Sequence, residues 1–403
     1  MKVRGRFDLT YCSNIHAGES WAEVRHAIGA ALPEVRRHLA HAGPLAIGLR
    51  LSARAAEELD QPPALAEFRA FLRDGDYYVP TINGFPFGAF HRERVKENVY
   101  LPDWRDRRRV EYTNRLANLL ATLLSDGGTT EASVSTVPGA FKGHMHAPGD
   151  AAAIAAGILE HAAHLVALRK STGVTIVLAI EPEPACFIET AAEAVDFFAR
   201  FLFDDAFVRS QSRLTIDEVR RHVGVCFDAC HMAVEFEDHA AALASLDRAG
   251  IRVPKFQISS ALRVSDPSPG SAGRRALERF AEDTYLHQVV EQSAAGLRRF
   301  VDLPEALGAS ALTAAGAQAP AWPGKNEWRI HFHVPVFLRT MGDLETTQPD
   351  LETVLDLVKT RADSPCLEVE TYTWDVLPPE YRTAEMSAAI ARELAWTRQR
   401  LEA

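Results

Sequence analysis

The sequence predicts an α/β protein built as one (β/α)8 barrel, a TIM barrel. Short apolar runs of strand length alternate with longer amphipathic segments of helical period along all 403 residues. Strand-then-helix units repeated in this way are typical of a parallel sheet with crossover helices. Since such barrels often exceed about 250 residues as one unit, we expect residues 1–403 to form a single domain.

The strand-like runs are short and apolar. They cover residues 7–12, 45–51, 77–82, 132–137, 174–180, 223–227, 253–258, 329–334 and 366–371. Nine runs are one more than an eight-stranded barrel needs, so one of them is expected to belong to a hairpin or lid. The longest interval lies between the seventh and eighth runs. We therefore predict an insertion or lid over residues 259–328, with an ordered helix at 277–290 and loops that cover the barrel mouth.

The helical segments lie between most of these runs. They cover residues 21–40, 103–124, 150–170, 190–203, 239–249 and 351–361. Their apolar residues recur with the period of an amphipathic helix, so we expect them to pack around the sheet as crossovers.

Composition and charge exclude several classes of protein. Hydrophobic residues make up 47% and charged residues 24%, a balance typical of a folded protein with a large core rather than a disordered chain. With 44 basic and 54 acidic residues, the net charge is −10, which argues against a nucleic-acid partner. No apolar segment follows the charged N-terminus, and no uninterrupted apolar run approaches the roughly 18 residues of a membrane span. We therefore expect no secretory signal and no membrane insertion.

Five cysteines are present, and their number and spacing argue against a disulfide framework. The count is odd, there is no C-x-x-C pair, and each cysteine lies in or beside an apolar run. This pattern predicts reduced, buried thiols and a cytoplasmic protein, and it argues against a zinc site made of thiolates.

Residue types that bind metal ions occur at the ends of several strand-like runs. Glu181 directly follows the run at 174–180, Asp228 follows the run at 223–227, and Glu370 lies near the end of the last run. The carboxyl ends of barrel strands converge on one mouth, which holds the active site. Because side chains alternate along a strand, the apolar neighbours of these three carboxylates are expected to face the helices while the carboxylates face inward.

Carboxylates gathered in one cavity repel one another and are costly to bury, so a bound divalent cation would stabilise them. The candidate metal ligands are Glu181, Asp228, Gln257, His333 and Glu370. Mostly oxygen ligands with a minority of imidazole favour Mn²⁺, Mg²⁺, Co²⁺ or Zn²⁺. The sequence leaves open whether Gln257 or His333 completes the set. A capping or loop-entry role is the alternative for each residue taken singly.

Polar residues that follow other strands are candidates for binding a substrate. They are Asn14, His16, Asn83, His231 and Lys142. Ordinary turn chemistry explains the Asn-Gly pair at 83–84 equally well. Lys142 would suit a substrate that carries a phosphate group. The arginines at 105 and 107–109 are better explained as a solvated helix face.

The order of these strand ends resembles that of the xylose-isomerase-like TIM barrels, a superfamily that includes sugar epimerases and family IV apurinic endonucleases. The pattern is a glutamate, then Asp-x-x-His at 228–231, then a polar strand, then a final glutamate. Segments at 9–16, 83–88, 95–104, 135–138, 331–335 and 367–374 look more closely like those of a metabolite traffic protein. The epimerases of the superfamily usually present histidine as the third metal ligand, where this chain offers Gln257 unless His333 supplies the imidazole.

The resemblance implies a metal-dependent isomerase or epimerase in a secondary-metabolite precursor pathway. Its partner would be a small sugar, cyclitol or other polyol, with or without a phosphate, and Glu181 and Glu370 would carry the proton next to a carbonyl. One alternative is a metallohydrolase or endonuclease, which would want more histidines, clustered for two or three ions. Another is a binding or carrier protein that has lost turnover. The sequence also leaves a homo-oligomer open.

Overall fold

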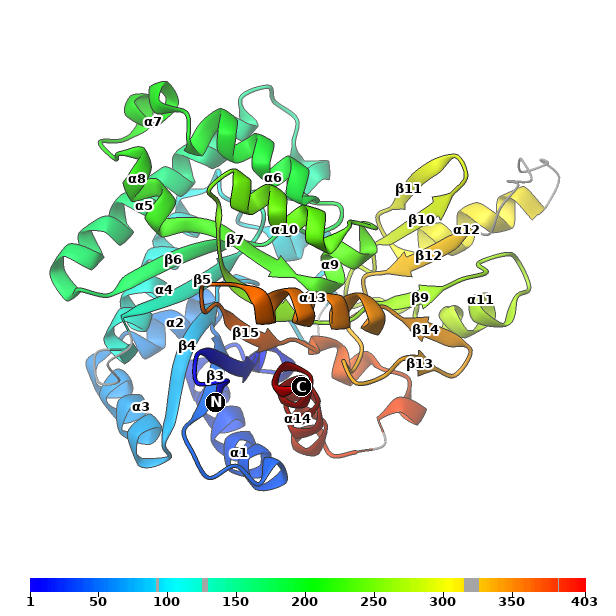
Figure 1. Ribbon diagram of the computed structural model, residues 1–403, viewed down its shortest axis with the longest axis horizontal. Helices are drawn as coiled ribbons and strands as arrows, with labels where there is room; N and C mark the ends of the chain where they lie inside the picture. The colour runs from blue at the N-terminus through cyan, green and yellow to red at the C-terminus, as the bar shows by residue number, and fades with distance from the viewer. Residues whose placement is uncertain (92–93, 125–129, 315–325, 383) are drawn as a thin grey trace.

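Parallel strands form the larger of two sheets in the protein (Figure 1). The computed structural model describes residues 1–91, 94–124, 130–314, 326–382 and 384–403. The sheet has the order β1-β2-β15-β8-β7-β6-β5-β4-β3, with only β1 (Lys2–Val3) antiparallel to its neighbour. Its parallel strands are β2 (Phe7–Tyr11), β3 (Leu45–Arg50), β4 (Tyr77–Asn83), β5 (Glu131–Thr136), β6 (Thr175–Ile180), β7 (Val223–Asp228), β8 (Arg252–Ile258) and β15 (Cys366–Val369).

The sheet curls until its two ends meet. A parallel bridge joins Cys12, just after β2, to Gly48 in β3, so the first and last parallel strands of the order lie side by side. Gly48 leaves room for this approach, because a Cβ there would fall 1.4 Å from the Glu368 carboxylate. The curl brings the carboxyl ends of all the parallel strands to one mouth.

Helices cover the outside of the curled sheet (Figure 1). Those that follow its strands are α1 (Trp21–Leu39), α2 (Ala53–Leu59), α3 (Pro62–Asp74), α4 (Arg107–Leu124), α5 (Asp150–Thr172), α6 (Ala191–Phe197), α7 (Asp205–Gln211), α8 (Ile216–His222), α9 (Ala229–Val234), α10 (His239–Arg248) and α14 (Met386–Glu402), and α13 (Gln348–Thr360) directly precedes β15. Their ends follow local rules. Ser20 and Glu23 form a capping box at the start of α1, and Gly173 ends α5 with a φ of +77°.

A second, antiparallel sheet lies to one side of the first (Figure 1). In the chain, its strands come after β8 and before β15. Its order is β11-β10-β12-β9-β14-β13. The strands are β9 (Leu262–Val264), β10 (Val289–Ser293), β11 (Gly296–Phe300), β12 (Glu327–Ile330), β13 (Thr340–Met341) and β14 (Leu344–Thr346), with α11 (Ala272–Leu277) and α12 (Leu303–Ala314) beside them. The run at 329–334 is the one that the barrel does not use. Its first residues belong to β12, which pairs with β10 and β9 rather than with the parallel sheet.

Three details of this region differ from the sequence-based expectation. The run predicted at 329–334 is strand only to Ile330, and His331 and His333 lie in the irregular segment beyond it. The second sheet extends past residue 328, through β13 and β14. The helix predicted at 277–290 is wrong. The chain there ends α11, makes one short turn and enters β10, because its apolar residues pair in the second sheet. Residues 315–325 of the predicted insertion lie outside the described residues.

One described helix, α5, is long and apolar enough by length and composition to cross a membrane. The sequence-based reading found no such segment because charged and polar residues interrupt its apolar run. Ile154, Ile158 and Leu165 are buried, and α5 packs against α4 and β6. The helix is therefore accounted for by core packing within this chain.

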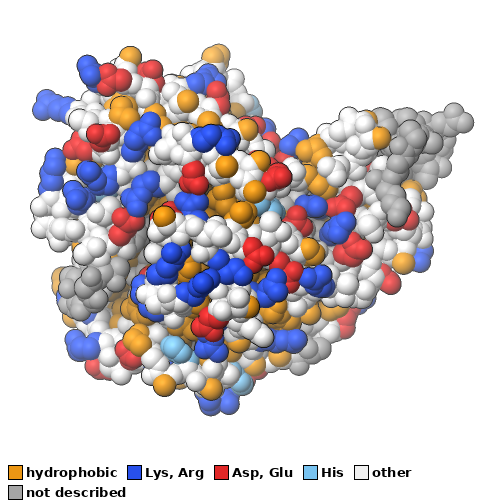
Figure 2. Space-filling model, viewed as in Figure 1, with side chains coloured by type: hydrophobic (Ala, Val, Ile, Leu, Met, Phe, Trp, Pro, Cys, Tyr) orange, Lys and Arg blue, Asp and Glu red, His pale blue; other side chains and the backbone are white. Residues whose placement is uncertain are grey.

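The surface charges and the cysteines are arranged as the composition predicted. Figure 2 shows basic and acidic side chains interspersed over the face drawn there. All five cysteines are free and buried.

Candidate metal centre and active site

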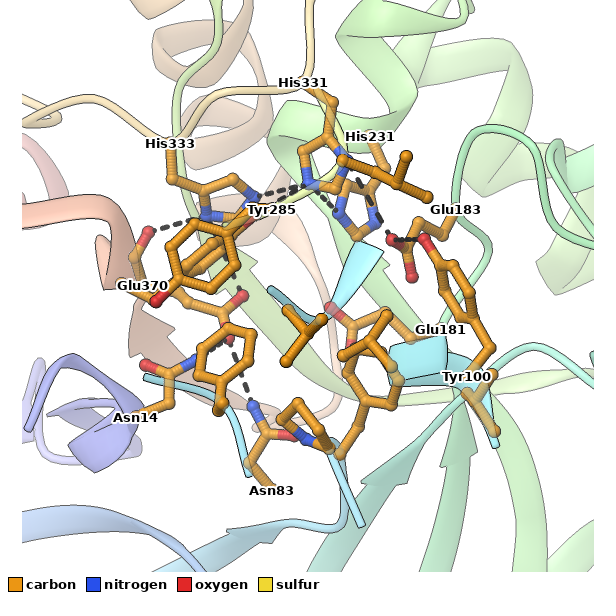
Figure 3. A pocket seen from close by; sticks show the side chains of 18 of the residues that line it. Asn14, Asn83, Tyr100, Glu181, Glu183, His231, Tyr285, His331, His333 and Glu370 are labelled. Carbon is orange, nitrogen blue, oxygen red and sulfur yellow. Dashed lines mark hydrogen bonds and ion pairs between the residues drawn. The ribbon is translucent and has the colours of Figure 1, made fainter. Parts of the chain in front are cut away.

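A pocket opens at the carboxyl ends of the parallel strands, where the second sheet faces the mouth (Figure 3). It encloses about 620 Å³ of empty space, part of it open to solvent. Its polar lining is Asn14, Asn83, Glu181, Glu183, His231, His331, His333 and Glu370. These residues come from the ends of β4 and β6, from the turns after β2 and β15, from α9 and from the segment after β12.

Three carboxylates meet on the strand side of the pocket. Ligand atoms of Glu181, Asp228 and Glu370 all lie within 4.8 Å of one another, and all three side chains are buried. Burial, followed by the charges of Glu370 and Asp228, raises the pKa of Glu181 well above its usual range. Burial and the charge of Asp228 raise the pKa of Glu370 to about 8. A cation held among these oxygens would oppose both shifts.

The end of β7 and its neighbour β8 carry polar atoms without partners. Asp228 Oδ1 accepts from the His231 backbone N–H at 2.7 Å and from Ser259 Oγ at 2.9 Å, so Asp228 does cap α9. Its Oδ2 has no hydrogen-bond partner, and neither polar atom of the fully buried Gln257 amide has one. Asp228 and Gln257 are register partners in adjacent strands, so their side chains point to the same face. These orphaned oxygens fit a divalent cation with oxygen ligands.

Hydrogen bonds hold the outer carboxylates in position. Asn14 Nδ2 donates to Glu370 Oε1 at 2.7 Å, and Asn83 Nδ2 donates to the same oxygen at 3.1 Å. The Tyr100 hydroxyl donates to Glu183 Oε1 at 2.6 Å. Asn14 and Asn83 therefore line the pocket next to Glu370 and hold its carboxylate in place. A substrate that contacts either amide would lie beside that carboxylate.

Three imidazoles form the other polar wall (Figure 3). His331 Nε2 lies 3.1 Å from His231 Nε2 and 3.2 Å from His333 Nε2. Burial and the neighbouring histidines hold the pKa of His331 well below its usual range. Burial is also the main cause that lowers the pKa of His333, to about 4. Both rings are therefore neutral around pH 7, the form of imidazole that binds metal ions.

The rest of the lining is apolar and aromatic. It includes Phe85, Pro86, Phe90, Val95, Val99, Tyr100, Val137, Pro138, Tyr285, Leu286 and Tyr372. Lys96 is the one basic side chain other than histidine among the described lining residues. Its ammonium donates to Asp302 at 2.7 Å and to two backbone carbonyls, so its charge is already matched.

The structure brings most of the predicted site residues together and separates two of them. Asn14, Asn83, Glu181, His231, His333 and Glu370 line the pocket, with Asp228 beside its carboxylates. Gln257 lies in the strand next to Asp228. His16 instead packs against Tyr11, with its Nε2 at 3.2 Å from the Tyr11 hydroxyl. Lys142 is half-exposed and pairs with Glu189 and Glu193.

His16 and Lys142 lie outside the pocket lining for different reasons. His16 ends a short 3₁₀ turn that carries Asn14 inward and turns the next residues away. Lys142 is drawn to the acidic start of α6, where two glutamates offset its charge. Arg107 and Arg108 are exposed and pair with Glu111 and Asp106. The predicted solvated face is wrong for Arg109, which is completely buried because its guanidinium donates to the Pro102 and Gly84 carbonyls.

Sequence reasoning missed His331, Glu183, Tyr100 and Gln288 as site residues. The alternation His331-Phe-His333 was visible, since two histidines on one face of an extended segment reach the same place. Tyr100 and Gln288 carried no comparable signal, because each is brought to the pocket by a long loop or by the second sheet.

No family model matches the sequence, and no curated protein matches it. Among solved structures, the chain is similar to a xylose isomerase-like TIM barrel protein from Mycobacterium smegmatis in complex with magnesium. The two share 12% identity with a TM-score of 0.50, over 98% of this chain and 96% of the other. The chain has a xylose-isomerase-like TIM-barrel fold. Less similar structures are a D-psicose 3-epimerase with D-fructose (14% identity, TM-score 0.47, 98% and 100% coverage) and an IOLI protein with bound zinc (12%, 0.45, 98% and 98%).

Proposed function

We propose that this protein is a divalent-metal-dependent isomerase or epimerase that acts on a sugar, cyclitol or related polyol. The observation that carries the proposal is the buried group of Glu181, Asp228 and Glu370, together with the unpartnered oxygens of Asp228 and Gln257. We propose further that the curled sheet is a closed (β/α)8 barrel. The motifs that resemble the metabolite traffic protein EboE would place this protein in a secondary-metabolite precursor pathway, and we propose that it acts in the cytoplasm.

The residues that would hold the cation are Glu181, Asp228 and Glu370, with the Gln257 amide oxygen beside them. Such an ion, Mn²⁺, Mg²⁺, Co²⁺ or Zn²⁺, supplies Lewis-acid polarisation of a substrate carbonyl or hydroxyl. Glu181 and Glu370 come from β6 and from the turn after β15, and each presents its carboxylate to the pocket. One would remove the proton next to the carbonyl, and the other would return a proton to complete the isomerisation.

The protein's own donors would orient the substrate. Asn14 and Asn83 hold Glu370 Oε1 in a fixed direction, which leaves its other oxygen to exchange a proton. The aromatic wall excludes water from the pocket and offers faces against which a ring can pack. Because Lys96 is already paired with Asp302, the pocket favours an uncharged polyol over a phosphorylated one.

A second candidate is a metallohydrolase, and one observation favours it. That observation is the cluster of imidazoles formed by His231, His331 and His333. A metallohydrolase site contains several clustered histidines, whereas an isomerase site has mainly oxygen ligands. The net charge of −10 argues against a nucleic acid as its substrate. A binding protein without turnover would share the ion but not the proton transfer.

The test compares Asp228→Asn and Glu370→Gln with Arg108→Ala, which removes an exposed side chain that pairs with Asp106. We expect elemental analysis of the purified proteins to show metal loss in the first two and full metal content in Arg108→Ala. Wild-type protein should also exchange a carbon-bound hydrogen of a ketose or inosose panel with D₂O. Full metal occupancy in Asp228→Asn would refute the metal site, while metal binding without exchange would favour the binding protein.

A further inference from the structure

We propose that the substrate carries an apolar group, such as an aromatic ring, on the part of its carbon chain away from the reacting carbonyl. This inference names the substrate class of the pocket, and it rests on the proposed function for the reacting end of that substrate. It depends on the apolar wall of the pocket, which consists of the apolar and aromatic lining residues given above, and not on the carboxylates.

The apolar wall comes from separate parts of the chain. Phe85 and Val99 belong to the long loop between β4 and α4, Leu286 precedes β10 of the second sheet, and Tyr372 follows β15. These segments meet only in the folded protein. The tertiary fold therefore builds an apolar surface directly beside a buried group of carboxylates.

Aromatic rings occupy two parts of this wall. Phe90, Tyr285 and Tyr372 contact one another, with ring centroids 4.9, 5.2 and 5.3 Å apart. Phe85 and Tyr100 stack on one another at 5.6 Å. Figure 3 shows Tyr285 on the side of the pocket that holds Glu370, and Tyr100 on the side that holds Glu183. The pocket thus offers aromatic carbon beside both carboxylates.

The tyrosine hydroxyls of the wall already have partners. The Tyr100 hydroxyl donates to Glu183 Oε1 at 2.6 Å and accepts from Gln288 Nε2 at 2.9 Å. The Tyr372 hydroxyl has one longer contact, 3.5 Å to His331 Nε2, and is therefore directed to the imidazoles. Neither hydroxyl points to the apolar part of the wall.

The two remaining polar side chains on this side are bonded as well. The Tyr285 hydroxyl lies 2.9 Å from His91 Nδ1, and the other nitrogen of that ring lies 2.6 Å from the Asn14 carbonyl. The Lys96 ammonium has three hydrogens to donate. It donates to Asp302 and to two backbone carbonyls, at 2.7, 3.0 and 2.6 Å, so none is left for a ligand.

A substrate hydroxyl set against this wall would lose its water without gaining a partner. A buried polar group without a hydrogen bond is costly, whereas burial of apolar surface is favourable. The polar side of the pocket is different, because Asn14 Oδ1 is buried there without a partner and can accept from a hydroxyl. A free sugar or cyclitol carries hydroxyls at both ends, so it matches only the polar side. A polyol with an apolar group at one end matches both.

The test compares 6-O-methyl-D-fructose with 6-O-benzyl-D-fructose, two ketose ethers that differ by a phenyl ring. Isothermal titration calorimetry of the full-length protein saturated with Mn²⁺ gives the two dissociation constants. We expect the benzyl ether to bind about 10-fold or more tightly, because the ring becomes buried against the wall. Val99→Thr keeps the shape of a half-buried side chain but adds a hydroxyl to the wall, and it should lower that ratio severalfold. Val301→Thr is the matched control, since Val301 is exposed and is not among the described lining residues.

Exchange of a carbon-bound hydrogen of the methyl ether with D₂O separates this proposal from the proposed function. Equal dissociation constants for the two ethers, or an unchanged ratio in a folded Val99→Thr protein, would overturn the apolar group, and exchange would then leave the isomerase standing. Tighter binding of the benzyl ether without exchange would support the apolar group and refute the isomerase. Failure of both ethers to bind or exchange would overturn both proposals.

Discussion

Lys255 and Glu368 form an ion pair inside the parallel sheet, with Lys255 Nζ 2.6 Å from Glu368 Oε1 and both side chains completely buried. Lys255 also donates to Ser135 Oγ at 3.0 Å. The pair joins β8 and β15, and Glu368 lies two residues before Glu370, the pocket carboxylate that follows the same strand. Lys255 neutralises Glu368, and it is the one completely buried lysine among the described residues. The carboxylates of Glu181, Asp228 and Glu370 are therefore left for a bound cation.

Breaking this pair should destabilise the fold strongly. Lys255→Met leaves the Glu368 carboxylate buried without its partner, which typically costs about 3–5 kcal/mol. The double variant Lys255→Met, Glu368→Leu should recover part of that loss, since no charge remains buried. Urea unfolding monitored by circular dichroism measures both. A double variant as unstable as the single one would show that the pair contributes more than charge compensation.

Gly48→Ala should be destabilising for a steric reason. The added Cβ would fall 1.4 Å from Glu368 Oε2, and that carboxylate cannot move without leaving Lys255. Overpacking of a buried site costs about 1–3 kcal/mol. Gly88→Ala is the matched control, because a Cβ there meets nothing within 4 Å. Equal melting temperatures for the two variants would contradict the close approach seen at Gly48.

Stability should fall as the pH rises from about 4.5 to 7 on account of Glu393. Burial raises the pKa of this carboxyl to about 7, so in that range the folded state binds a proton that the unfolded state has lost. Glu393 nevertheless accepts from Thr371 Oγ1 at 2.7 Å and from the Val336 N–H at 3.1 Å. Glu393→Gln keeps an acceptor without the charge. Its free energy of unfolding should exceed that of the wild type at pH 8, by an amount up to about 3 kcal/mol, and match it near pH 4. A constant difference across this range would rule out the titration.

Lys142→Ala should leave the pocket unchanged. The half-exposed lysine pairs with the buried Glu189 and the exposed Glu193 near the start of α6, and none of these three side chains is among the described pocket-lining residues. Its metal content should equal that of the wild type. A variant with weakened metal binding would return Lys142 to the site, as the sequence had indicated.

The alternation of strand-like and helical segments was enough to predict the parallel sheet. The acidic residues at the ends of the strand-like runs were enough to predict the carboxylates that meet at its mouth. Glu181, Asp228 and Glu370 each follow a strand whose pairing is set by its own apolar residues, so their convergence follows from topology. Short helices such as α2 and α9 were not predicted, because a helix of six or seven residues shows less than two full periods of apolar spacing.

The imidazole wall was beyond sequence reasoning because non-local pairing creates it. The run at 329–334 has the apolar content of a barrel strand, and only its pairing with β10 and β9 shows that it belongs to the second sheet. That pairing sets His331 opposite His231, 100 residues away in the chain. Sequence reasoning could not place Lys142 outside the pocket lining, because a basic residue after a strand does not reveal that two glutamates near the next helix pair with it.

The second sheet contributes His331 and His333, whereas His231 follows a strand of the first. The pocket therefore exists only while the two sheets are docked, and local opening of the smaller one would dismantle it without unfolding the larger. A ligand that fills the pocket and contacts both sheets would oppose that opening, by a free energy that grows with the logarithm of its concentration above the Kd. Amide hydrogen exchange in β10 and β12 should then slow as a pocket ligand is added, while exchange in β6 and β7 stays unchanged. Ligand binding would therefore stabilise the docking of the second sheet onto the first.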